Sequence, residues 1–263
     1  MKYILFLLLT VLMLSCKQSS EPKKVDTKTI EKEIVPKKYP EAISKVFEAH
    51  GGLDVWNDMK SLSFTMPKPD GNEITTVNLK NRKSRIEMPK HTIGFDGKEV
   101  WLQSKDTTTY KGNPKFYYNL MFYFYAMPFV LSDNGIHYEN ATALEFEDKQ
   151  YPGIKISYES GVGESSDDEY VMYYDPETYQ MAWLGYTVTY FSKEKSKDFH
   201  YIKYYEWQQV NGLLLPKILQ WYQVVDGKIT EKRNDVEFID VMVSKEKSNP
   251  TIFVKPENAE SVE

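Results

Sequence analysis

Histidine is the side chain most often used for acid–base chemistry near neutral pH, and this chain of 263 residues contains four histidines. They are His50, His91, His137 and His200, and no two of them have the close spacing of zinc ligands on one helix. The HExxH, GxSxG, P-loop and GxGxxG patterns are also missing from the sequence. His50 precedes a glycine pair, so we expect it to end a helix and bond to the last helical carbonyls. The sequence therefore predicts no catalytic residue, no metal ligand and no cofactor.

Carboxylates gather at 163–169, where the run GESSDDE places four acidic side chains within seven residues. Calcium prefers such oxygen ligands, but the spacing and the glycine of an EF-hand loop are missing. We interpret the run as the solvated tip of a hairpin. A pair of carboxylates for glycoside hydrolysis stays open, because their separation is set in space and not in sequence. An envelope hydrolase is thus kept as an alternative to a non-enzymatic protein.

Cys16 is the only cysteine of the chain, so no internal disulfide can form. Cys16 comes after a basic residue, Lys2, and an apolar run over 4–14. This run is too short to span a bilayer, because a span needs about 20 apolar residues. This layout is typical of a signal peptide. Met13-Leu14-Ser15-Cys16 resembles the lipobox of bacterial lipoproteins, which implies cleavage before Cys16 and lipid on its sulfur. An ordinary secretory signal with an incidental core cysteine is the alternative.

These features predict the organisation of the chain. Residues 1–15 are the signal peptide, 16–38 a lipidated flexible tether, 39–245 a single domain and 246–263 a C-terminal tail. The chain has 33 basic and 38 acidic side chains, and its net charge of −5 argues against nucleic-acid binding. We expect a monomer of the cell envelope that is held at a membrane through lipid on Cys16. The expected membrane is the outer membrane, with the domain facing the periplasm.

Helical periodicity is confined to the start of the domain. Ile43, Val46 and Phe47 recur at helical spacing after Pro40, and a second short helix is expected at 53–59. Alternating patterns then predict strands at 61–66, 74–80, 84–88, 92–95, 100–104, 107–111, 154–159, 169–174, 182–191, 198–208, 215–225 and 228–241.

Tight turns separate these strands, for example at the Asp-Gly pair 96–97 and the Asn-Gly pair 211–212. Successive hairpins imply antiparallel pairing, because parallel strands need long crossovers. A sheet of ten or more strands tends to curl. We therefore predict a mainly β (α+β) fold. It would be a single strongly curved antiparallel sheet, or unclosed β-barrel, with helices packed in its concave side.

The segment 116–131 interrupts the strand pattern, since it carries no charge and contains eight aromatic residues. Its apolar residues cover every face, so a helix formed here must be buried nearly all round. Pro128 is expected to end or bend this helix. The segment would be a core helix that plugs the curved sheet, or a lid over an apolar cavity, or a stretch that dips into a membrane.

Several short blocks of the sequence are distinctive. They are AHGGL at 49–53, Trp56, KSLSF at 60–64, FDGKEVW at 95–101, FYF at 122–124, MPFVL at 127–131, GIHYE at 135–139, YYDPET at 173–178 and NGLLLPK at 211–217. Together these blocks resemble those of a family of bacterial lipoproteins of unknown function. The hairpin blocks also resemble, more distantly, the LolA-like and LppX-like outer-membrane lipoprotein carriers. That resemblance implies an unclosed barrel around an apolar cavity for acyl chains. A soluble shuttle role does not fit a chain that is expected to carry lipid on Cys16.

The resulting hypothesis is a non-catalytic lipoprotein that binds an acyl chain or another lipid, such as a fatty acid. The predicted ligand-binding residues come from the central segment and from alternating positions on later strands. They are Phe122, Tyr125, Met127, Phe129, Leu184, Tyr186, Val188, Tyr201 and Trp207. A filled barrel that docks a protein partner and binds no ligand is a third possibility.

Overall fold

The structure is a computed structural model that describes residues 38–159, 167–192 and 194–262. The described residues from Tyr39 onward belong to one compact unit. Cys16 and the predicted tether up to residue 37 lie outside the described residues, so the lipidation prediction stays a prediction.

The domain opens with two short helices, as predicted. α1 (Glu41–Ala49) buries Ile43, Val46 and Phe47 on one face, and α2 (Leu53–Asp58) buries Trp56. A glycine pair separates the helices, and both of its glycines have positive φ values, which side chains with a Cβ atom rarely adopt.

Within the described residues, the strands form two antiparallel sheets of seven strands each. Sheet A consists, in spatial order, of β13 (Ile239–Ser244), β1 (Ser61–Met66), β2 (Glu73–Asn78), β3 (Ser84–Glu87), β4 (His91–Phe95), β5 (Val100–Ser104) and β14 (Glu260–Val262). Sheet B consists of β12 (Lys228–Glu237), β11 (Leu213–Val225), β10 (His200–Val210), β9 (Met181–Tyr186), β8 (Tyr170–Tyr174), β7 (Lys149–Tyr158) and β6 (Ile136–Phe146).

The mainly β antiparallel fold is confirmed, but the strands form two sheets where a single one was expected. Two changes along the chain divide them. Helical residues replace the hairpin between β5 and β6, so these strands are not neighbours. At the other end the chain runs from β12 directly into β13, where it changes partner: Glu237 pairs with β11 and Ile239 with β1. Asp240 takes a positive φ of 51° just after this change. The strand orders leave both sheets open among the described residues.

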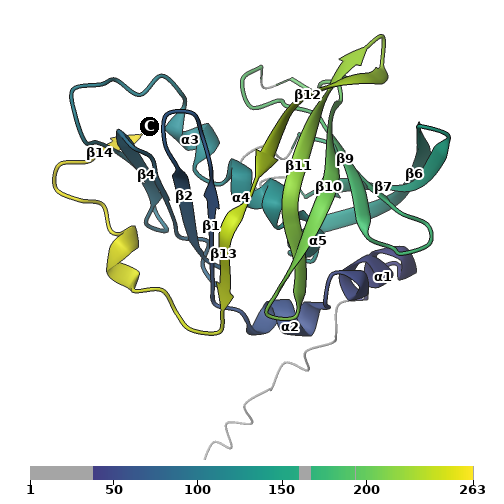
Figure 1. Cartoon of the computed structure of the whole chain (residues 1–263), viewed down its shortest axis with the longest axis horizontal. Helices are drawn as coiled ribbons and strands as arrows, with labels where there is room; N and C mark the ends of the chain where they lie inside the picture. The colour runs from purple at the N-terminus through teal and green to yellow at the C-terminus, as the bar shows by residue number, and fades with distance from the viewer. Residues whose placement is uncertain (1–37, 160–166, 193, 263) are drawn as a thin grey trace, which may run out of the picture. The chain divides into compact units, whose positions relative to one another are not determined.

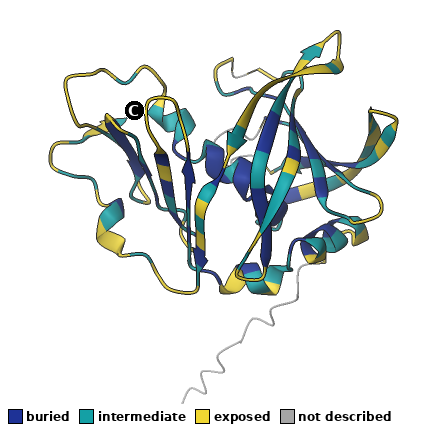
Figure 2. Ribbon diagram, in the orientation of Figure 1, coloured by how far each residue is buried: buried dark blue, intermediate teal, exposed yellow. Residues whose placement is uncertain are grey.

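The main hydrophobic core draws residues from both sheets, from α1 and α2, and from the central helical segment. This segment comprises α3 (Pro114–Tyr117), α4 (Leu120–Tyr125) and α5 (Met127–Val130). Figure 1 shows α4 between the two sheets, and in Figure 2 this helix is largely coloured as buried. All four residues of α5 are buried as well. Of the interpretations left open for 116–131, the structure therefore supports a core segment. Among the described residues no helix is both long and apolar enough to cross a membrane.

Residues 246–262 belong to the domain, so its predicted boundary at 245 needs correction. After a short 3-10 helix, η1 (Pro250–Phe253), the chain pairs as β14 with the edge strand β5. Phe253 is fully buried, and its carbonyl oxygen accepts a hydrogen bond from Trp101 Nε1 at 3.2 Å. Phe253 is a single large apolar side chain in a mostly polar segment, so the composition of the segment did not indicate that it belongs to the domain.

The hairpin of β6 and β7 was largely missed at the sequence level. Its turn uses Glu147 and Asp148, which both adopt positive φ (49° and 61°) without the usual asparagine or glycine. Two other predicted strands differ from the structure. The 107–111 segment is irregular, and β9 ends at Tyr186 instead of extending to 191.

Candidate functional site

The central helical segment bends because of its polar and proline positions. Asn113 starts α3, and its side chain accepts a hydrogen bond from the backbone N–H of Phe116 at 3.0 Å. α4 ends at Tyr125, and Pro128 stands in the first turn of α5, where its missing N–H leaves no helical bond unmade. The predicted break at Pro128 is thus realised as two separate short helices.

Aromatic contacts fix this segment between the sheets. The Phe129 ring stacks on Trp56 with centroids 4.5 Å apart, and the Tyr125 ring lies 4.6 Å from Phe64. Tyr204 from sheet B donates its hydroxyl hydrogen to the backbone carbonyl of Phe124 at 2.6 Å. Ser84 from sheet A likewise donates its hydroxyl hydrogen to the backbone carbonyl of Tyr118 at 3.2 Å. Both sheets therefore hold the segment by packing and by hydrogen bonds to its backbone.

The four ligand-binding residues predicted from this segment are all core residues. Phe122, Tyr125, Met127 and Phe129 are at most 2% exposed. Phe122 differs from the other three because it also lines a cavity, which is described below.

The predicted residues from β9 fall into two groups. Leu184 is fully buried, and the half-buried Tyr186 ring lies 5.0 Å from the Phe124 ring of α4. Tyr186 therefore packs against the central segment, and Leu184 belongs to the main core. Val188 lies two residues beyond the end of β9, so strand alternation does not determine its direction.

Tyr201 and Trp207 were expected on one face of β10, but they lie on opposite faces. Tyr201 packs beside Trp183 in a separate cluster, whereas Trp207 packs on the main core, 4.3 Å from the His50 ring. The ladder between β10 and β11 shifts register twice between Tyr204 and Trp207. Such an irregularity inverts the alternation of side chains, and the amino-acid pattern does not reveal it.

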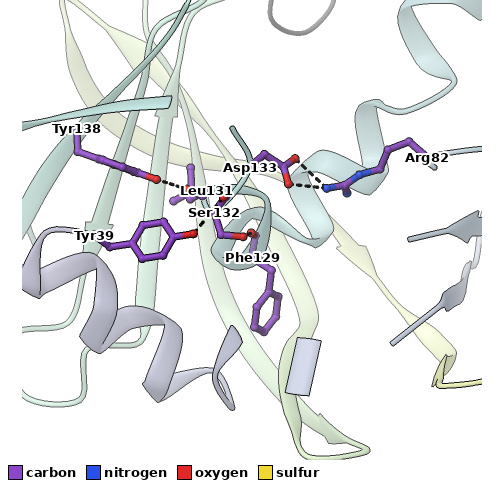
Figure 3. Close-up of polar contacts among 7 residues, drawn as sticks. All are labelled: Tyr39, Arg82, Phe129, Leu131, Ser132, Asp133 and Tyr138. Atoms are coloured by element: carbon purple, nitrogen blue, oxygen red, sulfur yellow. Dashed lines mark hydrogen bonds and ion pairs between the residues drawn. The ribbon is translucent and has the colours of Figure 1, made fainter. Parts of the chain in front are cut away.

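Polar contacts hold the end of the central segment, as Figure 3 shows. Tyr39, just before α1, donates its hydroxyl hydrogen to the Ser132 carbonyl at 3.2 Å, and Tyr138 from β6 donates to the Leu131 carbonyl. Arg82 places Nη2 2.8 Å from each carboxylate oxygen of Asp133. Helix C-termini leave carbonyls without helical partners, and here side chains from other elements satisfy them.

A small cavity of about 90 Å³ lies between sheet A and α4. Its lining is mostly apolar and aromatic, with Arg82 as the only charged residue. The lining residues are Val77, Arg82, Ser84, Phe95, Tyr118, Asn119, Phe122 and Tyr123. Arg82 stands in the turn between β2 and β3 with a φ of 60°, and its guanidinium lies 5.0 Å from the Phe122 ring centroid. The arrangement suits a ligand with an apolar part and one polar group.

His50 is fully buried and joins three elements. Its Nδ1 lies 3.2 Å from the Leu214 carbonyl oxygen of β11, and its Nε2 accepts a hydrogen bond from the Met181 N–H of β9 at 3.0 Å. Nε2 must be unprotonated to accept, so Nδ1 carries the proton and donates to Leu214. Burial lowers the pKa of His50 from 6.5 to about 4. His50 does end α1, but its ring bonds to two strands and not to the helical carbonyls expected.

Gly51 allows this close approach of α1 to sheet B. Its φ is +104°, and a Cβ at this position would lie 2.2 Å from the Gly212 carbonyl oxygen. The backbone N–H of Leu214 also bonds to the His50 carbonyl at 3.0 Å. The AHGG and NGLLLPK blocks are therefore two halves of one structural contact, which explains both motifs without a catalytic role.

A buried carboxyl lies at the start of β2. Glu73 is 6% exposed and accepts a hydrogen bond from the Tyr117 hydroxyl of α3 at 2.7 Å. Burial raises the pKa of Glu73. Desolvation favours the neutral acid, and the tyrosine bond only partly offsets it. The pair fastens α3 to sheet A, and no sequence pattern pointed to it.

The acidic run at 163–169 is described only from Asp167 onward. Asp168 is 8% exposed, and its Oδ1 accepts hydrogen bonds from the Thr189 N–H and hydroxyl at 2.6 and 2.7 Å. Glu169 forms an ion pair with Lys155 at 2.9 Å. Asp168 therefore holds the segment after β9 in place, where a solvated residue was expected. No three potential metal ligands cluster in the described part of the chain.

One histidine does approach a carboxylate. His137 Nε2 lies 3.8 Å from Glu159 Oε1, but both side chains are 61% exposed. A hydrolase requires such a pair to be positioned in a cleft, with a nucleophile or a bound water beside it. This surface pair does not meet that requirement.

Comparison with solved structures gives similarities at very low sequence identity. A LolA superfamily protein from Nitrosomonas europaea is 10% identical, with a TM-score of 0.47, over 80% of this chain and 96% of that chain. A DUF1329 family protein from Desulfovibrio piger is 9% identical, with a TM-score of 0.44, over 76% of this chain and 91% of that chain. The LolA-like resemblance of the sequence thus recurs here. Because both TM-scores lie below 0.5, we draw neither fold nor function from these similarities.

No curated protein matches the sequence. The sequence profile of DUF6503, described as a family of unknown function, matches residues 2–237. The predicted membership of a family of unknown function is confirmed, and the chain belongs to the DUF6503 family.

Proposed function

We propose that this protein is a non-catalytic lipoprotein of the cell envelope that binds an apolar ligand, such as an acyl chain, against its central helical segment. The observation that carries the proposal is the cavity between sheet A and α4. It has an apolar and aromatic lining, a single charged residue, and a predicted ligand-binding residue, Phe122, in its wall. Such a combination is typical of sites for small amphiphilic molecules.

The proposed location follows from the N-terminus. Lipid on Cys16 would hold the chain at a membrane, which we propose to be the outer membrane on its periplasmic side, and residues 16–38 would serve as the tether. Apolar ligands would be available at that membrane. A diacylglycerol with a further acyl chain supplies the two anchors that stable attachment requires.

The experiment is mass spectrometry of organic extracts from the chain 17–263, purified without detergent. Every described element lies after residue 38, so this chain keeps the whole domain. We expect a lipid or fatty acid in stoichiometric amount. Val77→Phe would fill the cavity and remove that ligand, whereas Val171→Phe makes the same change at a buried site in a separate cluster and would leave it. Equal ligand content in the two variants, or none in the parent, would contradict the proposal.

A second candidate function is docking of a protein partner without any small ligand. It is favoured by the dense packing of the central segment, in which Tyr125 and Phe129 are fully buried. Two wider hollows of about 520 and 720 Å³ have mixed charged linings, and they suit a protein surface better than a lipid. An empty extract from the parent chain would favour this candidate.

A further inference from the structure

Arg82 is placed to interact with more than its ion-pair partner. It stands at the tip of the β2–β3 turn in a left-handed conformation, with a φ of 60° that is uncommon for a residue other than glycine. Its side chain reaches the end of the central segment, where Nη2 binds both carboxylate oxygens of Asp133. Figure 3 shows this pair, whose partners are 51 residues apart in the sequence.

The other terminal nitrogen of Arg82, Nη1, is buried and has no hydrogen-bond acceptor. Four further buried side-chain atoms in the described part of the chain share this condition, namely Thr75 Oγ1, Thr92 Oγ1, Tyr125 OH and Trp183 Nε1. Arg82 differs from these four residues because it lines the cavity beside α4. A buried donor without an acceptor costs about 1–3 kcal/mol, and more when it is charged. An acceptor brought by a ligand in the cavity would recover that cost.

The charge at this position selects the kind of acceptor. Asp133 already balances the charge of Arg82 through two contacts of 2.8 Å. A second anion beside the guanidinium would face the Asp133 carboxylate as well, and like charges at close range repel. A neutral oxygen can accept from Nη1 without this repulsion. The site therefore favours an ester or amide carbonyl over a free carboxylate or phosphate.

The size of the cavity limits what lies next to that carbonyl. Its volume of about 90 Å³ is smaller than the ~150 Å³ apolar cavity that holds benzene in an engineered protein. Only a few carbons fit, lined by Val77, Phe95 and Phe122. The remainder of a longer ligand must extend outside the cavity.

We propose that Arg82 Nη1 donates a hydrogen bond to the carbonyl oxygen of a neutral acyl ester or amide, whose adjacent carbons occupy this cavity. The inference rests on the proposed function, because it names the class of apolar ligand that this site takes. It distinguishes acylated molecules, such as acylglycerols, from free fatty acids. Asp133 is a positioning residue in this arrangement, since it holds the guanidinium and sets its charge balance.

The test measures binding of methyl octanoate and of octanoate to the chain 17–263, after removal of its co-purified lipid, at pH 8 by calorimetry. We expect the parent chain to bind the ester more tightly than the acid. Arg82→Lys can keep the ion pair with Asp133 but lacks Nη1, so it is expected to weaken ester binding about tenfold, which corresponds to the loss of one hydrogen bond. Arg85→Lys is the matched control, because Arg85 also has a carboxylate partner, its Nη1 has an acceptor, and it does not line the cavity.

Asp133→Asn provides the second arm. It removes the competing negative charge and leaves Arg82 in place, so octanoate should gain affinity relative to the ester by about tenfold or more. This arm keeps the proposal testable if Arg82→Lys does not fold.

Three outcomes overturn the inference. In the first, Arg82→Lys binds the ester as tightly as Arg85→Lys does. In the second, the parent chain prefers the acid, and in the third, Asp133→Asn leaves the preference unchanged. All three leave the proposed apolar ligand in place. If the parent chain binds neither probe, this inference and the proposed acyl-chain function fail together.

Discussion

The histidine that joins α1 to sheet B makes a sharp prediction about stability and pH. His50 is fully buried, accepts a hydrogen bond from Met181 and donates one to Leu214, so it must stay neutral in the folded protein. Burial lowers its pKa from 6.5 to about 4. Between these two pH values the imidazole of His50 is protonated in the unfolded chain but stays neutral in the folded protein. This contribution to stability is fully present above pH 6.5 and is lost as the pH falls toward 4.

The magnitude follows from the two pKa values. At pH 5 the unfolded chain binds nearly one more proton than the folded protein, and integrating the linkage relation from pH 7 to pH 5 gives a loss of about 2 kcal/mol. That is a large share of the 5–15 kcal/mol by which domains of this kind are stable. Buried carboxyls titrate over the same range, so the wild-type curve alone does not isolate His50.

The His50→Asn variant isolates the effect. Its amide nitrogen can still donate toward Leu214, but it cannot titrate and it leaves the Met181 N–H without its acceptor. We expect the variant to be less stable at pH 7 by about 1–3 kcal/mol. The assay is urea unfolding of both proteins at pH 7 and pH 5, with His137→Asn as the same change at an exposed histidine. Wild type should lose about 2 kcal/mol more than His50→Asn on acidification. Parallel losses in the two proteins would refute the buried neutral histidine.

Three further changes test the contacts around the core. Glu73→Gln should be more stable than wild type at pH 7 and similar to it near pH 4, because burial raises the pKa of Glu73 and penalises its charged form. Urea unfolding curves at both pH values check this, and equal stability of the two proteins at pH 7 would contradict it. Gly51→Ala should destabilise the domain by more than about 1 kcal/mol, measured as a lower midpoint in urea, since its Cβ would lie 2.2 Å from a backbone oxygen of the β10–β11 turn. An unchanged midpoint would mean that the approach is looser. Tyr204→Phe should cost about 1–2 kcal/mol in the same assay, because the buried carbonyl of Phe124 loses its donor. A neutral result would show that this hydrogen bond does not help sheet B to hold the central segment.

The local pattern of the sequence was sufficient for the parts of the fold that local physics decides. Helical spacing located α1 and α2, and Asp-Gly and Asn-Gly pairs located hairpin turns, because only a few residues tolerate positive φ there. The uncharged segment at 116–131 indicated a buried interruption, since so much apolar surface is costly in water. These inferences needed only neighbours along the chain.

The tertiary structure decided whatever depends on partners distant in sequence. His50 bonds to residues 131 and 164 positions away, and Arg82 pairs across 51 positions, so neither contact leaves a periodic trace. A register shift in β10 placed Tyr201 on the face opposite to Trp207, although strict alternation predicts one shared face. The division into two sheets likewise depends on distant partners, because the chain leaves β11 at the end of β12 and pairs with β1 as β13.

At the candidate site, too, the sequence indicated some residues and only the tertiary structure revealed others. The sequence singled out Phe122, which lines the cavity, because an aromatic residue in a buried segment is visible from composition. It missed Arg82, because an arginine in a polar turn resembles any solvated surface residue until the fold brings it over the cavity. What the sequence by itself determined was which segments must be buried and where the chain turns. Only the tertiary structure decided which polar group lies beside the cavity, because that depends on packing between elements and not on order along the chain.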